Sequence, residues 1–336
     1  MGKWMPCILT AVGLAAAATA PVWTILVSGV TGRLRGISVV SEKVVWASGA
    51  NGTIVRTADG GLHWKPLSVP EAGSLDFRDI DAIDERTAYA LSIGPGEASR
   101  IYKTNDAGEH WTLQFQNRDP KVFLDAMAFW NGQRGLAVGD SVDGRFVILH
   151  TVNGGVTWER AAENGLPPAL SEEGAFAASG TNIAVQGTRH AWIGLGSGRV
   201  LRTEDGGKNW QVFVTGIPSS PSAGIFSIAF QDTRRGVAVG GDYKQEDRAE
   251  KNAAVTEDGG RSWRIVRGLG GYRSVVRWAG GTTFVAVGPS GADISYDSGK
   301  TWRAASGPGF HTFDAAPGKR LGFGAGERGL VGRLEW

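Results

Sequence analysis

The chain of 336 residues lacks several features that would indicate particular chemistries. It has one cysteine, Cys7, so no disulfide can form within it. Its 35 lysines and arginines are offset by 33 aspartates and glutamates, and this balance argues against a nucleic-acid-binding surface. The five histidines form no cluster in sequence, and no glycine-rich phosphate loop lies between a strand and a helix. We therefore predict no metal, no cofactor and no nucleic acid.

Long uncharged stretches are also scarce, and the clearest is N-terminal. Lys3 is the only charge in the first 32 residues, and the apolar run that follows ends in Ala-Thr-Ala. This order predicts a signal peptide at 1–20, followed by one domain at 21–336 in a secreted or periplasmic protein. The alternative is an uncleaved anchor, because the uncharged span 4–32 is long enough to cross a membrane. Pro21 interrupts that span, so we expect no stable membrane span after processing.

Glycine, by contrast, is abundant, with 51 residues, and many of these glycines fall in one repeated turn. The turn first appears as TADGGLHW at 57–64. Five related copies follow: TNDAGEHW (104–111), TVNGGVTW (151–158), TEDGGKNW (203–210), TEDGGRSW (256–263) and SYDSGKTW (295–302).

The closing tryptophans recur every 39 to 53 residues, a period typical of propellers. In the first unit, apolar runs at 34–40, 44–49, 53–57 and 64–69 predict four strands. The second strand is the easiest to match between units because it is short, mainly apolar and has a glycine at or next to its end. Its copies are VWASG (45–49), LAVGD (136–140), WIGLG (192–196), VAVGG (237–241) and FVAVG (284–288).

Each position of the turn has a structural interpretation. A hydroxyl residue opens it, and an Asp or Asn two residues later accepts backbone N–H bonds. We assign a positive φ to the invariant fifth-position glycine, and we expect the tryptophan to pack between sheets. The predicted structural residues are Asp59, Asp106, Asn153, Asp205, Asp258, Asp297, Trp64, Trp111, Trp158, Trp210, Trp263 and Trp302.

This turn resembles the Asp box, or bacterial neuraminidase repeat, of sialidases, sortilin-like receptors and photosystem II stability/assembly factors. The long forms at 48–64 (SGANGTIVRTADGGLHW) and 194–210 (GLGSGRVLRTEDGGKNW) are most similar to the assembly factors. The resemblance implies an all-β propeller over nearly the whole chain. It is weak for function, because these families share the turn but differ in activity.

Six turns predict seven blades once the chain ends are included. FHTFDAAPG (310–318), LGFGAG (321–326) and LVGRLEW (330–336) provide three strands of a last blade. VWTILVSG (22–29) provides its outer strand. We therefore predict a seven-bladed β-propeller of four-stranded antiparallel blades, closed by pairing of the N- and C-terminal strands.

The two faces of this propeller differ in the length of their loops. The repeated turns share one face with short connections, whereas the opposite face carries long loops at 92–100, 139–145, 159–175, 216–224 and 240–252. Long loops on a rigid scaffold are where function concentrates. On this face we predict a basic rim, suited to carboxylates or an acidic peptide, and two charged loops. The candidate residues are Arg35, Arg78, Lys121 and Arg273 of the rim, and Glu172, Glu173, Asp242 and Tyr243 of the loops.

A hydrolase is the alternative from another class. A sialidase could use Tyr243 as nucleophile with Glu172 or Glu173, but the Arg-Ile-Pro segment customary in sialidases is replaced by LRGIS at 34–38. A carboxylate-pair glycosidase could use Glu172 with Asp242. A cofactor-dependent oxidoreductase lacks a recognisable motif. We therefore favour a monomeric, exported propeller that binds a protein or peptide partner without catalysis.

Overall fold

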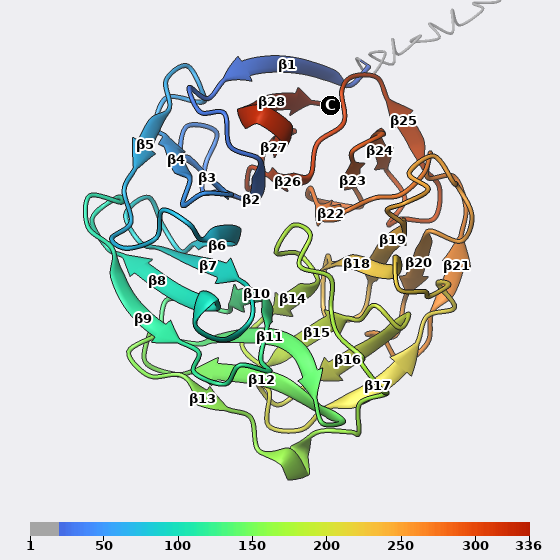
Figure 1. Ribbon diagram of the computed structural model, residues 1–336. Helices are drawn as coiled ribbons and strands as arrows, with labels where there is room; N and C mark the ends of the chain where they lie inside the picture. The colour runs from blue at the N-terminus through green and yellow to red at the C-terminus, as the bar shows by residue number, and fades with distance from the viewer. Residues whose placement is uncertain (1–19) are drawn as a thin grey trace, which may run out of the picture.

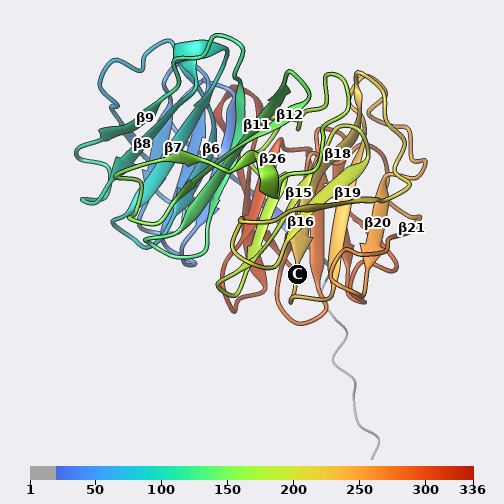
Figure 2. The ribbon, with the colours of Figure 1, turned by 90° about the horizontal axis from the view of Figure 1, so that it is seen from below.

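The computed structural model describes residues 20–336, so the predicted signal peptide falls almost entirely outside the described residues. Seven four-stranded antiparallel sheets form a ring around a central channel (Figure 1). Figure 2, turned by 90°, shows the strands of the blades running between the two faces of the ring. The predicted all-β, seven-bladed fold is confirmed.

The blades follow the chain order, and each runs from an inner to an outer strand. Blade 1 contains β2 (Leu34–Val39), β3 (Val45–Gly49), β4 (Ile54–Thr57) and β5 (Lys65–Leu67). Blade 2 contains β6 (Asp76–Ala82), β7 (Ala88–Ile93), β8 (Arg100–Thr104) and β9 (Thr112–Gln116). Blade 3 contains β10 (Leu124–Phe129), β11 (Gly135–Val142), β12 (Arg145–Thr151) and β13 (Glu159–Arg160). Blade 4 contains β14 (Ile183–Gln186), β15 (His190–Gly194), β16 (Arg199–Thr203) and β17 (Gln211–Val214).

The remaining blades complete the ring. Blade 5 contains β18 (Ala223–Phe230), β19 (Gly236–Asp242), β20 (Ala253–Thr256) and β21 (Arg264–Val266). Blade 6 contains β22 (Val275–Trp278), β23 (Phe284–Gly288), β24 (Gly291–Ser295) and β25 (Arg303–Ala305). Blade 7 contains β26 (Thr312–Ala315), β27 (Leu321–Ala325), β28 (Leu330–Glu335) and β1 (Val22–Val27). Short 3₁₀ turns lie at Gly96–Ala98, Glu163–Gly165 and Glu327–Gly329.

The two ends of the chain close the ring, as predicted. Strand β1 pairs antiparallel with β28, from Val22 opposite Glu335 to Val27 opposite Leu330. Trp23 of β1 packs on Phe310, with ring centroids 4.4 Å apart. The N-terminal strand is therefore the outer strand of the last blade and covers the edge of β28.

The repeated turn is held by short-range hydrogen bonds. In blade 1, the Thr57 hydroxyl donates to Asp59 Oδ1 at 2.8 Å and accepts the Gly61 N–H at 3.0 Å. Asp59 Oδ1 also accepts the His63 N–H at 3.0 Å. The turn also places its tryptophan between blades: Trp302 packs in one cluster with Val237 and Val239 of β19 and Phe284 of β23.

The two central positions of the turn differ from our expectation. The fourth and fifth positions both have positive φ, as Ala107 (66°) and Gly108 (88°) show, whereas the sequence predicted this conformation for the fifth position alone. The fifth-position glycine is required by the limited space around its Cα as well as by its backbone angle. A Cβ on Gly108 would lie 2.4 Å from Leu67 Cδ1 and 3.2 Å from Trp46, both in the preceding blade. In blade 2 the fourth position lacks this restriction, since Ala107 is accommodated there.

Candidate functional site

A pocket of about 420 Å³ opens at the long-loop end of the central channel, and we call it the long-loop pocket. It lies where the inner strands begin, which is the face that the sequence indicated. Its lining includes Arg35, Arg78, Ile93, Phe123, Asp125, Asp140, Phe176, Phe226, Tyr243, Glu246, Tyr272 and His311.

Arg35 and Arg78 supply the positive charge of this pocket. Arg78 pairs with Asp76 at 2.9 Å, but within residues 20–336 the single hydrogen bond of Arg35 runs from Nη1 to the Ala178 carbonyl oxygen at 3.4 Å. Arg35 Nε is buried and has no hydrogen-bond partner in the described part of the chain. Burial and the neighbouring Arg78 lower the pKa of Arg35 to about 10, which still leaves it cationic at neutral pH. Arg35 is therefore a half-buried cation whose ion-pairing capacity is unused.

The other two members of the predicted rim do not line this pocket, so the structure does not bring the four residues together. Arg273 is buried, and both Nε and Nη2 lie 2.7 Å from Asp293 Oδ2, so its charge is neutralised inside blade 6. Lys121 is exposed and pairs with Asp143 at 3.0 Å. The position of a cation near the start of an inner strand does not reveal whether a neighbouring strand provides its counter-ion.

The segment 174–182, which we call the plug, passes through the middle of the channel. In Figure 1 the connection between β13 and β14 runs from the outer edge of the ring into its centre. Arg78 Nη1 donates to the Ala177 carbonyl oxygen at 2.7 Å, and the Ser179 hydroxyl donates to the Ser274 carbonyl oxygen at 2.8 Å. Gly180 (φ 68°) sits against Asp79, where a Cβ would lie 2.3 Å from the carboxyl carbon. The plug is thus fixed to several blades.

The predicted loop carboxylates Glu172 and Glu173 lie in different environments. Glu173 is buried, and its carboxylate accepts from Ser197, from the Leu170 N–H at 2.9 Å and from Arg199 Nε at 2.8 Å. Burial opposes ionisation, but these hydrogen bonds outweigh it and hold the pKa of Glu173 below its usual value. Glu173 therefore anchors the plug, and the prediction that it faces a partner is wrong. Glu172 is exposed at the adjacent turn and does not line the long-loop pocket.

The other charged loop, between β19 and β20, contributes an aromatic group. Tyr243 is 43% exposed and lines the pocket, whereas Asp242 lies outside it and accepts the Lys244 N–H at 2.9 Å. Phe176 of the plug stacks on Phe226, with centroids 3.9 Å apart, and Tyr243 meets the pair edge-on. The pocket therefore combines aromatic surface with charge, a combination suited to peptide side chains.

Two acidic residues of this pocket were missed in the sequence. Asp125 lies on inner strand β10 with 1% exposure, and Asp140 lies on the adjacent strand β11. Burial and the nearby Asp140 raise the pKa of Asp125 well above its usual value, and burial raises the pKa of Asp140 to about 6. A charged residue inside the apolar run LDAMAF was the signal that could have revealed Asp125.

The chain is similar to proteins of a known family. The family model of the Photosynthesis system II assembly factor YCF48 matches residues 76–215, which comprise blades 2 to 4. The photosystem II stability/assembly factor HCF136 of Arabidopsis thaliana is 25% identical over 247 residues, covering 59% of this chain and 59% of the relative. Its counterpart from Cyanidioschyzon merolae is 34% identical over 214 residues, covering 57% of this chain and 46% of the relative.

The fold agrees with the sequence matches. A solved structure of YCF48 bound to D1 peptide superposes with a TM-score of 0.67 at 15% identity, covering 96% of this chain and 99% of that one. The chain is a seven-bladed propeller similar to the photosystem II assembly factors. The family resemblance that the repeated turn indicated is confirmed. The chain matches about half to three fifths of the length of the two HCF136 relatives.

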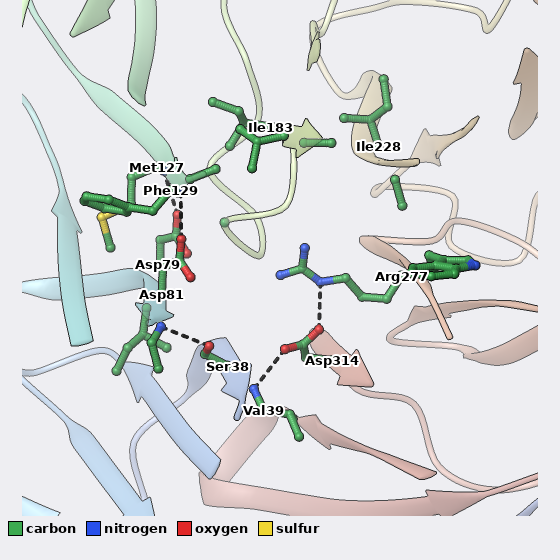
Figure 3. A pocket seen from close by; sticks show the side chains of 18 of the residues that line it. Ser38, Val39, Asp79, Asp81, Met127, Phe129, Ile183, Ile228, Arg277 and Asp314 are labelled. Carbon is green, nitrogen blue, oxygen red and sulfur yellow. Dashed lines mark hydrogen bonds and ion pairs between the residues drawn. The ribbon is translucent and has the colours of Figure 1, made fainter. Parts of the chain in front are cut away.

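This assembly-factor-like propeller has a second pocket, of about 330 Å³, at the other end of the channel (Figure 3). Asp79 and Asp81 lie on one side of it, and Asp314 pairs with Arg277 at 3.3 Å on the other. Each carboxylate accepts a backbone N–H of the next blade: Asp79 from Met127 (2.7 Å), Asp81 from Phe129 (2.9 Å) and Asp314 from Val39 (2.8 Å). These acids link neighbouring blades by hydrogen bonds, so we interpret the residues of this pocket as structural.

Residues 20–336 contain neither a candidate metal-binding cluster nor a candidate membrane-spanning helix. No three His, Cys, Asp or Glu side chains are grouped so that they could hold a metal ion. No helix in this part of the chain has the length and apolar character needed to cross a bilayer.

Proposed function

We propose that this chain is a non-catalytic assembly factor that binds a peptide segment of a partner protein in the long-loop pocket. The observation that carries the proposal is Arg35, a half-buried cation for which residues 20–336 provide no counter-ion and which faces an aromatic pocket beside Arg78. A carboxylate of the bound peptide would supply the missing partner. The similarity to photosystem II assembly factors and the likeness to YCF48 bound to D1 peptide support this assignment.

The proposal also places the protein outside the cytoplasm as a monomer. The N-terminal pattern supports export, with 1–20 as the signal peptide and 21–336 as the mature domain. Mass spectrometry of the mature protein tests this part. An N-terminus near Pro21 in soluble material is expected, whereas intact Met1 in a membrane fraction would contradict it.

Peptide selection tests the binding function. A displayed library of short random peptides is selected on the purified protein, and the enriched peptides are measured by fluorescence anisotropy. We expect enriched peptides to contain Asp, Glu or a free C-terminal carboxylate. Arg35→Ala should weaken their binding by roughly tenfold or more, since it removes one member of a partly buried ion pair.

Lys121→Ala is the matched control, because Lys121 is a cation outside the pocket. It should leave the affinity nearly unchanged. Binding should also weaken with added salt, since exposed charges are screened over about 8 Å at physiological ionic strength. Equal losses for the two variants, or no enriched peptide, would refute the proposal.

A hydrolase remains the second candidate, and Tyr243 is the observation that favours it, because it shares the pocket with Arg35 and Arg78. Glu173, however, is engaged by Arg199 and is not free to assist Tyr243. Assays with sialoside and glucoside reporters decide between the two classes. We expect no turnover; turnover that is lost in Tyr243→Phe would establish the hydrolase.

A further inference from the structure

Asp125 differs from three other acids of the inner strands. Asp79, Asp81 and Asp314 each accept a backbone N–H of the neighbouring blade, and these bonds explain why carboxylates line the channel. Asp125 Oδ2 is buried, but it has no hydrogen-bond partner within residues 20–336. A buried acceptor without a donor destabilises the folded state, so this arrangement calls for a donor from outside the chain.

The surroundings of Asp125 define what that donor must be. Asp140 lines the same pocket from the adjacent strand, and neither acid forms an ion pair within residues 20–336. Two carboxylates in one partly enclosed site repel each other, which agrees with the raised pKa of Asp125. A cation relieves this repulsion and supplies the missing donor. A metal ion is a poorer occupant, because no third acidic, histidine or cysteine ligand joins the pair in the described chain.

Apolar groups beside the two acids indicate that the occupant also has an aliphatic part. Ile93 and Phe123 line the pocket together with Asp125 and Asp140. Lysine and arginine side chains place aliphatic stems on such surfaces while their charged ends reach polar groups. The lining therefore fits a long basic side chain better than a small inorganic cation.

We propose that Asp125 and Asp140 form a second subsite, which binds a lysine or arginine side chain of the same peptide whose carboxylate binds Arg35 and Arg78. The inference rests on the proposed function of the long-loop pocket. It changes the expected partner from an acidic peptide to one that carries both charges. The basic subsite lies on blades 1 and 2 and the acidic subsite on blade 3, so the pocket also fixes the direction of the bound peptide.

Selection on three forms of the protein tests the inference. The wild type should enrich peptides with both an acidic and a basic residue. The double variant Asp125→Asn with Asp140→Asn should lose the basic residue and keep the acidic one. Arg35→Ala with Arg78→Ala should show the reverse. Asp143→Asn is the control, because Asp143 is an exposed acid of blade 3 outside this pocket and should leave the preference unchanged.

A double-mutant cycle measures how strongly the basic residue of the peptide interacts with Asp125 and Asp140. Replacing the basic residue of an enriched peptide by norleucine should weaken binding to the wild type by roughly tenfold. The same change should alter binding to the Asn double variant by less than about twofold. Wild-type enrichment of acidic peptides without lysine or arginine would overturn this inference and leave the proposed function intact. Failure to enrich any peptide would overturn both.

Stability provides a readout that needs no peptide. At neutral pH, Asp125→Asn and Asp140→Asn should each leave the melting temperature unchanged or raise it, because each removes like-charge repulsion. A clear fall in both variants would show that the two carboxylates support the fold, and would overturn the inference.

Discussion

Glu173 and Arg199 form an ion pair in the interior, in which Nε and Nη2 of Arg199 both donate to a fully buried carboxylate. The pair fixes the start of the plug to strand β16 of blade 4. Glu173→Gln should lower the free energy of unfolding by about 3 kcal/mol, because it leaves Arg199 without its counter-charge. Denaturant unfolding followed by tryptophan fluorescence measures this loss. Glu172→Gln, at the exposed neighbour, is the matched control and should have little effect; similar losses in both would disprove the anchoring role.

The repeated turn predicts different effects at adjacent positions of blade 2. Gly108→Ala should destabilise by about 1–3 kcal/mol, because the residue combines a φ of 88° with close contacts to Leu67 and Trp46. Ala107→Gly should be neutral or stabilise slightly, since it removes the cost of a positive φ at alanine. Thermal melting of both variants tests the order. A larger loss at Ala107 would mean that the positions have been assigned in reverse.

Ring closure predicts a strong effect of trimming the N-terminus. A protein that begins at Thr31 lacks β1, exposes the edge of β28 and removes Trp23 from its contact with Phe310. We expect a loss of about 3 kcal/mol or more relative to a protein that begins at Pro21. An unchanged melting temperature would show that β1 contributes nothing to closure.

The pocket of Figure 3 predicts a pH dependence of stability. Burial raises the pKa of Asp81 to about 6, above its unfolded value near 4. Between pH 4 and 6 the folded protein keeps a proton that the unfolded chain has lost. The stabilisation by this group is therefore complete below about pH 4 and disappears as pH rises through 6.

Asp81→Asn isolates this contribution, because asparagine can still accept the Phe129 N–H. The melting temperature of the wild type minus that of the variant should fall between pH 4 and pH 7. Asp79 and Asp314 are present in both proteins, and the repulsion between them and charged Asp81 is present in the wild type alone, so it adds to the same fall. A difference that is constant or rises with pH would contradict the assignment.

Most of the fold was predictable because its determinants are local. In the repeated turn, the hydrogen bonds of the hydroxyl and carboxylate side chains join residues at most four positions apart, as between Thr57 and Gly61. An eight-residue pattern can encode these side-chain bonds, although the Gly60 N–H also donates to the Lys43 carbonyl oxygen of the same blade. The period of the turn then gives the number of blades, and the strand left over at 22–29 predicts the closure. The sequence alone therefore determined the class, the blade count and the face that carries the long loops.

The site was decided by the tertiary structure. Arg35 and Arg273 occupy similar places near the start of inner strands, yet Arg273 meets Asp293 and Arg35 meets a carbonyl oxygen of the plug, 143 residues away. Asp125 and Asp79 both lie on inner strands, but only Asp79 accepts an N–H of the next blade. Charge pairing at a channel depends on which side chains neighbouring blades and one long connection bring together. A repeat encodes the blades but not these contacts across the ring, so only the folded chain distinguishes a free cation or acid from a paired one.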